Sequence, residues 1–496
     1  MGRWALWGCL ALGLPLMAEE EKAAEAPARP AVAQDDYYLR EEIPLPPGAV
    51  MELSGIAILP EKKVAVATRR GEIWICEGAY AEDLSAVRWQ RYAHGLHEPL
   101  GMYYRDGSIF VTQRPELTRL SDRDGDGRAD VFETLNQSWG INGDYHEYAF
   151  GSSPDKNGDV WVALCLTGSF NANSPWRGWA VRVTPEGEMI PTVGGVRSPG
   201  GIGFNAEGDL FYTDNQGPWN GSSSLKWLKP GSFQGNPSGN HFYKDSPLEE
   251  PVAPRTDSRI VKERERIESF VPPAVVLPHA KLGQSPTAVV PDLTKGAFGP
   301  FARQVFVGEQ THSQVQRVFL EKVNGLYQGA VWHFLDGFRA GIVPMKMGED
   351  ATLFVGGTNR GWASRGGKPF TFERVRWTGK VPFEMKEVRA RADGFEITFT
   401  EEIDAESVKN PASYELHSWT YLYRKDYGSP EVDASVPVLE EVVLGEDGRS
   451  IRLKIKGLVK GNVHSLHLPE VRAKDGRLLW HPTVYYTLNE IPQAAK

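Results

Sequence analysis

The sequence is poor in cysteine, has no excess of positive charge and contains no long apolar stretch beyond its N-terminus. Three cysteines occur in 496 residues and none forms a Cys-x-x-Cys pattern, which excludes a covalent c-type haem site in this chain. The 64 acidic and 55 basic residues give a net charge of -9. This balance excludes the basic footprint of a nucleic-acid-binding protein and fits cations or neutral polar ligands better.

Several catalytic motifs are also missing. The sequence has no Gly-x-Ser-x-Gly nucleophile elbow, no histidine pair at helical spacing and no phosphate-binding glycine loop. Beyond the N-terminal residues, no stretch approaches the roughly 20 apolar residues that span a bilayer, so no transmembrane segment is expected.

The N-terminus predicts export. Residues 1–18 carry one arginine, an apolar stretch and a final alanine, the pattern of a cleaved signal peptide. A lipoprotein site at Cys9 fits less well, because Trp7 is bulky and Cys9 lies early in the apolar run. Residues 19–36 lack aromatics and periodicity and predict a disordered lead-in. We therefore expect a periplasmic or secreted protein, in which Cys76 and Cys165 form either a disulfide or two buried thiols.

A degenerate repeat is the most informative pattern. Six units, each an apolar strand, a polar turn and a second strand, begin near residues 54, 99, 147, 201, 286 and 341. Apart from one gap they recur about every 45 to 55 residues, the length of a four-stranded propeller blade. We predict an all-β fold with a six-bladed β-propeller over residues 37–379. A solenoid is the alternative, but it would expose apolar end faces that a closed ring removes.

Two further segments complete the predicted domain organisation. Residues 219–284 are rich in proline, glycine, serine and asparagine, and we expect this insertion to shape or cover a pocket at the channel mouth. Residues 380–492 contain alternating strands such as FEITFTEEI and SIRLKIKGL, which predict a small immunoglobulin-like β-sandwich without the Cys-Trp-Cys pattern.

Residues 122–133, DRDGDGRADVFE, match a twelve-residue calcium loop. Gly127 permits the sharp turn, and no flanking helices of an EF-hand pair are evident. We predict a structural Ca²⁺ site between blade strands, the alternative being a solvated acidic turn. The predicted ligands are Asp122, Asp124, Asp126, Arg128, Asp130 and Glu133.

A second candidate site follows the strand in RSPGGIGFNAEGDLFYTDNQGP, residues 197–218. The carbonyl oxygens of Gly217 and Pro218 suit a hard cation, and such an ion could hold an anionic cofactor. Arg197 offers a bidentate fork for the same anion.

This stretch resembles the cofactor-carrying segment of the soluble quinoprotein glucose dehydrogenases and related six-bladed sugar dehydrogenases. The resemblance implies that pyrroloquinoline quinone (PQQ) is held by Arg197, with Ser198 where that family has asparagine, and that calcium is held by Gly217 and Pro218. INGDYHEYAFG resembles the segment with the catalytic base, which implies that His146 removes the sugar hydroxyl proton.

The same resemblance implies cofactor contacts for Thr287 in GQSPTAVV and Arg339 in DGFRAG. The chain departs from the family in GEQTHSQVQR, which lacks the lysine expected near the end of the fifth unit, and in having one arginine rather than two before the sixth. His279 and His312 are further candidates if they lie beside His146.

Over nearly the whole mature chain, the sequence also resembles secreted planctomycete and verrucomicrobial proteins of the membrane-bound-dehydrogenase-like, haem-binding-domain type. DRDGDGRADVFE, HEYAFG, GQSPTA and ASYELHSWTYLYRKDYGSPEVD carry this resemblance. Many of those proteins append a c-type cytochrome, so an oxidoreductase without one implies a separate electron acceptor.

Three functions remain open from the sequence. The first is a PQQ-dependent dehydrogenase acting on a small-molecule sugar or polysaccharide. The second is a non-catalytic carbohydrate- or protein-binding propeller. Its aromatic platforms would be Trp139, Trp176, Trp179, Trp219 and Trp332. The third is a calcium-dependent lactonase-like hydrolase using Asp214 and Asn215. In a structural interpretation, His146 bridges strands and Arg197 pairs with a neighbouring carboxylate.

Overall fold

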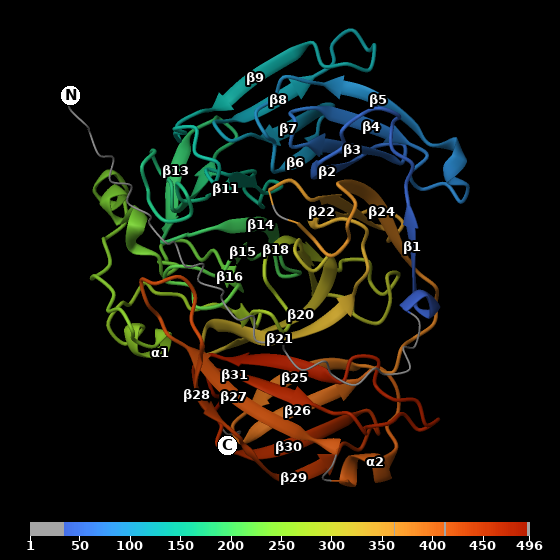
Figure 1. The fold of residues 1–496 in the computed structure, drawn as a ribbon, viewed down its shortest axis with the longest axis vertical. Coiled ribbons are helices and arrows are strands. Elements are labelled where there is room, and N and C mark those ends of the chain that lie inside the picture. The colour runs from blue at the N-terminus through green and yellow to red at the C-terminus, as the bar shows by residue number, and fades with distance from the viewer. Residues whose placement is uncertain (1–33, 362, 411–412, 494–496) are drawn as a thin grey trace, which may run out of the picture.

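The computed structural model describes residues 34–361, 363–410 and 413–493 of the chain. Six four-stranded antiparallel blades form a ring, and a two-sheet sandwich packs against one side of it (Figure 1). The predicted all-β fold class, a six-bladed propeller followed by a small sandwich, is confirmed. The predicted signal peptide and most of the predicted lead-in lie outside the described residues, and Gln34–Asp36 forms a 3-10 helix, η1.

The first three blades follow one another along the chain, each running from its inner to its outer strand. Blade one contains β2 (Leu53–Leu59), β3 (Lys63–Thr68), β4 (Ile73–Glu77) and β5 (Arg88–Ala93). Blade two contains β6 (Met102–Arg105), β7 (Ser108–Thr112), β8 (Leu117–Ser121) and β9 (Val131–Asn136). Blade three contains β10 (Ala149–Gly151), β11 (Val160–Leu164), β12 (Trp179–Val183) and β13 (Met189–Gly194).

The remaining blades close the ring, because the outer strand of blade six comes from the N-terminus. Blade four contains β14 (Pro199–Phe204), β15 (Leu210–Asp214), β16 (Ser224–Trp227) and β17 (Val275–Val276). Blade five contains β18 (Pro286–Pro291), β19 (Val305–Glu309), β20 (Gln314–Val323) and β21 (Leu326–Leu335). Blade six contains β22 (Ile342–Met347), β23 (Leu353–Thr358), β24 (Phe370–Trp377) and β1 (Tyr38–Glu42).

Packing between blades explains the apolar runs in the sequence. Every residue of β11 and β15 is buried, because the second strand of a blade is covered on both faces by its neighbours. The outer strand β9 alternates between half-buried and exposed positions instead. At Gly203 an added Cβ would lie 2.1 Å from the Val289 carbonyl oxygen, so this glycine lets the inner strands of blades four and five approach.

The segment 219–284 supplies β16 and β17 to blade four, and its long excursion runs over residues 228–274 between them. The excursion contains η3 (Pro237–Asp245) and α1 (Ile260–Glu263), which lie beside the ring in Figure 1. His279 and Gln284, at the C-terminal end of the segment 219–284, line the cavity at the channel mouth, whereas no residue of the excursion does. It packs on blade three through Trp179, whose indole N–H donates to the Gly239 carbonyl. Two other short helices are η2 (Leu84–Ala86) and α2 (Ala405–Lys409).

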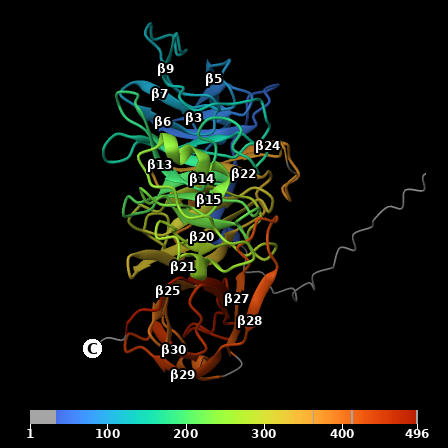
Figure 2. The same cartoon turned by 90° about the vertical axis from the view of Figure 1, so that its left-hand side faces the viewer.

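The C-terminal sandwich shares a sheet with the propeller. Its first sheet contains, in spatial order, β25 (Met385–Arg391), β26 (Gly394–Phe399), β30 (Ser450–Lys456) and β29 (Val438–Leu444). Its second contains β32 (Thr483–Leu488), β31 (Asn462–His467), β27 (Glu415–Tyr421) and β28 (Glu431–Ser435). Because β32 pairs with β21, blade five and the second sheet form one eight-stranded sheet. Figure 2 shows the sandwich continuing directly below β21.

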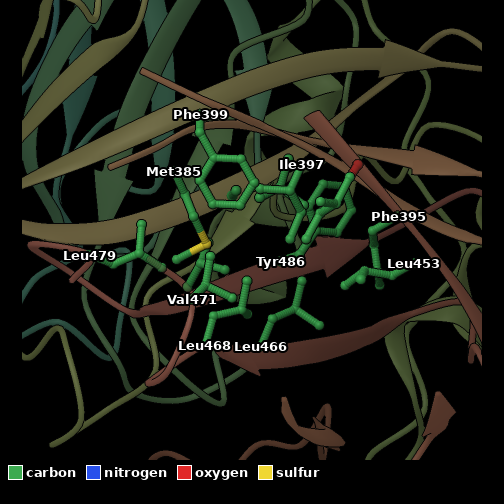
Figure 3. Close-up of a cluster of buried hydrophobic side chains, with 14 of the residues drawn as sticks. Met385, Phe395, Ile397, Phe399, Leu453, Leu466, Leu468, Val471, Leu479 and Tyr486 are labelled. Atoms are coloured by element: carbon green, nitrogen blue, oxygen red, sulfur yellow. The ribbon is translucent and has the colours of Figure 1, made fainter. Parts of the chain in front are cut away.

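The core of the sandwich extends into blade five. Aromatic and aliphatic side chains from both sheets, including Phe395, Ile397 and Tyr486, pack together in Figure 3. Phe319 and Trp332 of blade five belong to the same buried cluster. The two domains therefore share apolar contacts as well as backbone hydrogen bonds.

A buried arginine also joins the two domains. Arg317 of β20 is fully buried, and its guanidinium donates to the Met385 carbonyl at 2.8 Å and the Lys386 carbonyl at 3.1 Å. The Trp332 ring lies 4.0 Å from this guanidinium. Both carbonyls belong to β25, so the first strand of the sandwich is fixed to blade five.

Cys76 and Cys165 are buried free thiols, which resolves the two alternatives left by the sequence. Among the helices of the described residues, none combines the length and apolar character needed to cross a membrane.

Candidate functional site

A cavity of about 470 Å³ opens at one end of the propeller channel. It lies where the inner strands begin and where the second strands end, so loops from different blades converge on it. The residues that bear on function are Arg69, His146, Phe170, Arg197, Ser198, Asn215, His279, Thr287, Arg360 and Tyr427. A second cavity of about 770 Å³ occupies the opposite end of the channel, and Leu100, Phe150 and Val343 line both.

His146 lies in the turn that leads into β10, and hydrogen bonds hold this turn from both sides. The Asp144 carboxylate accepts from the backbone N–H of His146 at 2.8 Å and of Gly168 at 2.7 Å. The Arg114 guanidinium donates to the carbonyl oxygens of Asp144 at 2.5 Å and Tyr145 at 2.7 Å. The imidazole is therefore presented to the cavity by a rigid turn.

Arg177 supports the same region from beneath. It is fully buried and donates to the carbonyl oxygens of Tyr148 at 2.7 Å, Gly140 at 2.8 Å and Arg114 at 3.1 Å. Because carbonyl groups surround it, its charge is solvated by the backbone of the loop that carries His146.

Burial lowers the pKa of His146 below its ordinary value. The Asp144 carboxylate opposes this shift, while the charges of Arg197 and Arg114 add to it. A lowered pKa keeps the imidazole neutral near pH 7, the state in which it can accept a proton.

Arg197 lines the cavity and is 3% exposed. Its Nη1 donates to the carbonyl oxygens of Asn215 at 3.1 Å and Gln216 at 2.9 Å, while its buried Nε has no hydrogen-bond partner. No carboxylate of the described part of the chain lies within ion-pair distance of it, so it does not pair with a neighbouring acidic residue. The lining also contains Arg69 and Arg360, which pair with Glu98 and Glu52, but no aspartate or glutamate. The cavity is therefore electropositive in an acidic protein.

Gly217 and Pro218 lie outside the cavity lining. The Gly217 carbonyl accepts from the backbone N–H of Asn220 at 3.0 Å and of Gly428 at 3.2 Å. The Pro218 carbonyl accepts from the Asn236 side-chain amide at 3.1 Å. Hydrogen bonds already engage both oxygens and neither residue lines the cavity, so nothing in the structure supports the predicted cation role.

Gly217 has a different steric role. A Cβ added there would lie 1.9 Å from Cζ of Arg197, so the guanidinium rests directly on this residue. On another side the Tyr427 ring centroid lies 5.3 Å from the same Cζ.

The other predicted cofactor residues divide between the cavity and its surroundings. Ser198 and Thr287 line the cavity, and the Thr287 hydroxyl donates to the Ile342 carbonyl at 3.0 Å. Arg339 lies outside the lining; it is 58% exposed and pairs with Glu42 at 3.3 Å. His279 lines the cavity with His146 and its buried Nδ1 has no partner, whereas His312 is not part of the lining.

The predicted calcium loop brings together part of its ligand set. Carboxylate oxygens of Asp122, Asp124 and Asp130 lie within 4.8 Å of one another. Backbone N–H groups hold them, for example that of Gly127, which donates to Asp122 at 2.9 Å. Glu133 is not among them, because it lies on β9 and forms an ion pair with Arg119.

Asp126 and Arg128 also remain outside the carboxylate cluster. The Asp126 carboxylate accepts from the Arg128 N–H at 2.8 Å, and the Asp126 carbonyl accepts from the Gln90 side chain at 3.0 Å. Three of the predicted residues thus converge, and the loop differs from a complete twelve-residue calcium loop.

Most residues predicted for the two alternative functions, the binding propeller and the lactonase-like hydrolase, are buried. Trp139, Trp179 and Trp332 are buried, Trp176 packs on Trp179, and Trp219 packs on Tyr423. Asp214 is fully buried and pairs with Lys226 at 2.9 Å, so it cannot face a metal in the channel.

Sequence reasoning missed Arg114, Arg177 and Tyr427. The two arginines act on backbone carbonyls, a role without a sequence motif. Tyr427 comes from the sandwich, and only its place in the connection between β27 and β28 could have suggested an exposed position.

Fold and cavity together define a six-bladed propeller with an arginine-lined site at one end of its channel. The family model described as "Domain of unknown function (DUF7133)" matches residues 60–333, more than half of the chain, and the chain belongs to this family. The comparison with curated proteins gave no match.

Among solved structures, similar chains include an oxidoreductase from Thermus thermophilus that is described as a glucose dehydrogenase. The two sequences are 17% identical, the match covers 68% of this chain and 99% of that chain, and the TM-score is 0.48. The PQQ-bound aldose sugar dehydrogenase from Streptomyces coelicolor has 14% identity, 68% and 98% coverage and a TM-score of 0.48. The PQQ domain of pyranose dehydrogenase from Coprinopsis cinerea has 13% identity, 68% and 95% coverage and a TM-score of 0.47.

Proposed function

We propose that the protein is an exported oxidoreductase of the quinoprotein sugar dehydrogenase type, which oxidises a sugar hydroxyl group in the cavity at the channel mouth. The observation that carries the proposal is Arg197, a nearly buried arginine without a carboxylate partner in the described part of the chain, in the same cavity as His146. Burying an arginine without an opposite charge is costly, and an anionic ligand removes that cost.

The lining fits a planar, polycarboxylate cofactor such as PQQ. Arg197 lines it without a carboxylate partner, and its Nη1 is held by the carbonyl oxygens of Asn215 and Gln216. When bound, PQQ supplies the hydride acceptor for sugar oxidation. His146 takes the proton from the sugar hydroxyl, and its lowered pKa keeps it available for this role. No step is assigned to a calcium ion at Gly217 and Pro218.

We also propose Ca²⁺ as a structural ion in the loop 122–130. Three carboxylates held together by backbone N–H groups repel one another, and a cation removes that repulsion. Residues 1–18, together with the resemblance to secreted planctomycete and verrucomicrobial proteins, support export. The electron acceptor is then a separate molecule.

Equilibrium binding of PQQ to the purified protein tests the proposal. Removing the Arg197 charge by Arg197→Ala should weaken PQQ binding at least about tenfold, as loss of a charge-assisted hydrogen bond does. Arg339→Ala is the matched control, because Arg339 lies on the same side of the ring but outside the cavity. With PQQ bound, the wild-type protein should reduce a redox dye in the presence of a sugar, and His146→Ala should not.

Two other outcomes would replace this function. Sugar binding without PQQ and without dye reduction would identify a binding propeller. Lactone hydrolysis without PQQ would identify a hydrolase. No PQQ binding, together with silence across a broad panel of sugars, would overturn the dehydrogenase.

A further inference from the structure

The sandwich reaches the mouth of the propeller channel through the connection between β27 and β28, residues 422–430. The Trp219 N–H donates to the Arg424 carbonyl at 2.7 Å, and the Gly428 N–H donates to the Gly217 carbonyl at 3.2 Å. Tyr427 forms an isolated antiparallel bridge with Pro218. Backbone contacts of the connection 422–430 therefore hold Tyr427 at the cavity.

The excursion 228–274 fixes the other side of this connection. Ser258 and Tyr423 exchange backbone hydrogen bonds at 3.1 and 3.0 Å, and Arg259 pairs with Asp433 at 2.7 Å. The Tyr423 hydroxyl donates to the Gly235 carbonyl at 2.5 Å. The connection is thus held between blade four and the excursion, and its aromatic tip is pre-organised.

Two large aromatic side chains stay exposed at the rim of the cavity. Tyr427 is 59% exposed and Phe170 is 49% exposed, both line the cavity, and their ring centroids lie 6.3 Å apart. They come from different domains, because Phe170 follows β11 of blade three. Exposed aromatic surface of this size, beside a polar cavity, is typical of a binding site.

Size indicates which part of a ligand meets this pair. A cavity of about 470 Å³ that holds PQQ and the reacting sugar ring has little room for more of the substrate. A second sugar ring must then lie at the rim. Its apolar C–H face suits an aromatic ring, and its hydroxyl groups remain in water.

We propose that Phe170 and Tyr427 form an outer subsite for a second sugar residue, so that the substrate is an oligosaccharide rather than a free monosaccharide. This inference rests on the proposed function for the position of the reacting ring. The sandwich is then part of the substrate site, since it supplies one of the two rings.

Steady-state dye reduction with glucose, maltotetraose and cellotetraose tests the outer subsite. For the preferred tetrasaccharide, Tyr427→Ala and Phe170→Ala should each raise KM about three- to tenfold, the range of one aromatic contact. Phe170→Ala should leave kcat and the kinetics with glucose unchanged. Because the Tyr427 ring also packs on the Arg197 guanidinium, the tetrasaccharide KM of Tyr427→Ala is compared with the KM of the same variant for glucose. Tyr427→Phe keeps the ring and should behave as wild type. Phe132→Ala is the matched control, because Phe132 is 48% exposed on β9 and outside the cavity.

Saturation-transfer NMR with the same tetrasaccharides and protein without PQQ separates this inference from the proposed function. Transfer that Tyr427→Ala abolishes would support the subsite even if no sugar reduces the dye. Dye reduction that is equal for glucose and both tetrasaccharides, and unchanged in Tyr427→Ala, would overturn the subsite and leave the dehydrogenase standing. Silence in both assays would overturn both.

Discussion

At the scale of single residues, two buried arginines, Arg197 and Arg177, determine the properties of the site. Arg197 is buried with one nitrogen on backbone carbonyls and none on a carboxylate of the described residues, whereas Arg177 is equally enclosed but surrounded by carbonyls. The two arginines thus have different roles. Arg177 stabilises the loop that carries His146, and Arg197 is available to bind an anion. His146 lies close enough for the Arg197 charge to lower its pKa.

The first prediction concerns the pH dependence of His146. A base must be unprotonated, so kcat/KM should rise with pH and level off at higher pH, and the midpoint of the rise, the apparent pKa, should lie below the ordinary histidine value of about 6.5. Asp144→Asn removes the carboxylate that raises this pKa but keeps an oxygen for the two N–H groups. The rise should therefore move to lower pH, as measured by dye-reduction rates across pH. A profile that Asp144→Asn leaves in place would contradict this.

The second prediction concerns Gly217. Gly217→Ala places a methyl group 1.9 Å from Cζ of Arg197, so the guanidinium must leave its position and PQQ affinity should fall as far as in Arg197→Ala. Gly55→Ala is the control, because its methyl group would meet no atom closer than 3.2 Å. Equilibrium binding measures both. Full PQQ affinity in Gly217→Ala would show that the glycine does not position Arg197.

At the scale of elements, loops rather than strands determine the site. The turn before β10 presents His146, and the loop between β8 (Leu117–Ser121) and β9 gathers three aspartates. Each depends on side chain-to-backbone hydrogen bonds, which short polar residues form readily in turns.

The third prediction concerns the loop 122–130. Calcium in excess should raise the melting temperature of the wild-type protein by a few degrees, because binding to the folded state stabilises it by mass action. Asp124→Asn should lose most of this shift. Glu133→Gln should keep it, because Glu133 pairs with Arg119 outside the carboxylate cluster. Differential scanning calorimetry with calcium or a chelator measures these shifts; identical curves for the wild type would argue against bound calcium.

At the scale of the whole molecule, propeller and sandwich form one structural unit. The pairing of β21 with β32 covers the outer edge of blade five, and Trp332 and Phe319 are buried in the sandwich core. An unpaired edge strand and exposed aromatics would otherwise favour aggregation.

The fourth prediction follows from this shared core. Trp332→Ala should destabilise the protein by about 3–5 kcal/mol, the usual effect of truncating a buried tryptophan, and both domains should still unfold in one transition. Trp176→Ala, at a half-buried tryptophan on blade three, should cost less. Calorimetry combined with near-UV circular dichroism measures the effect. Two separate transitions in the wild-type protein would contradict the single unit.

The sequence predicted the propeller because each blade repeats a local pattern of apolar strand and polar turn. It also located His146, Arg197, Ser198 and Thr287, because loops beside inner strands converge on the channel in any closed ring. Tyr427 could not be located in this way, since its position depends on the long-range pairing of β21 with β32. For Gly217, a small side chain was evident from the sequence, but packing against Arg197 was not.

The pairing of β1 with β24 has a consequence for biosynthesis. The first strand of the ring to leave the ribosome is β1, and its partner, residues 370–377, is the last. At usual elongation rates, roughly 20 to 70 s separate the synthesis of β1 from the synthesis of β24. During that time β1 has no strand to pair with. Closure of the ring is therefore a late event that requires residues 370–377, and the nascent chain must be protected from pairing with other molecules until it occurs.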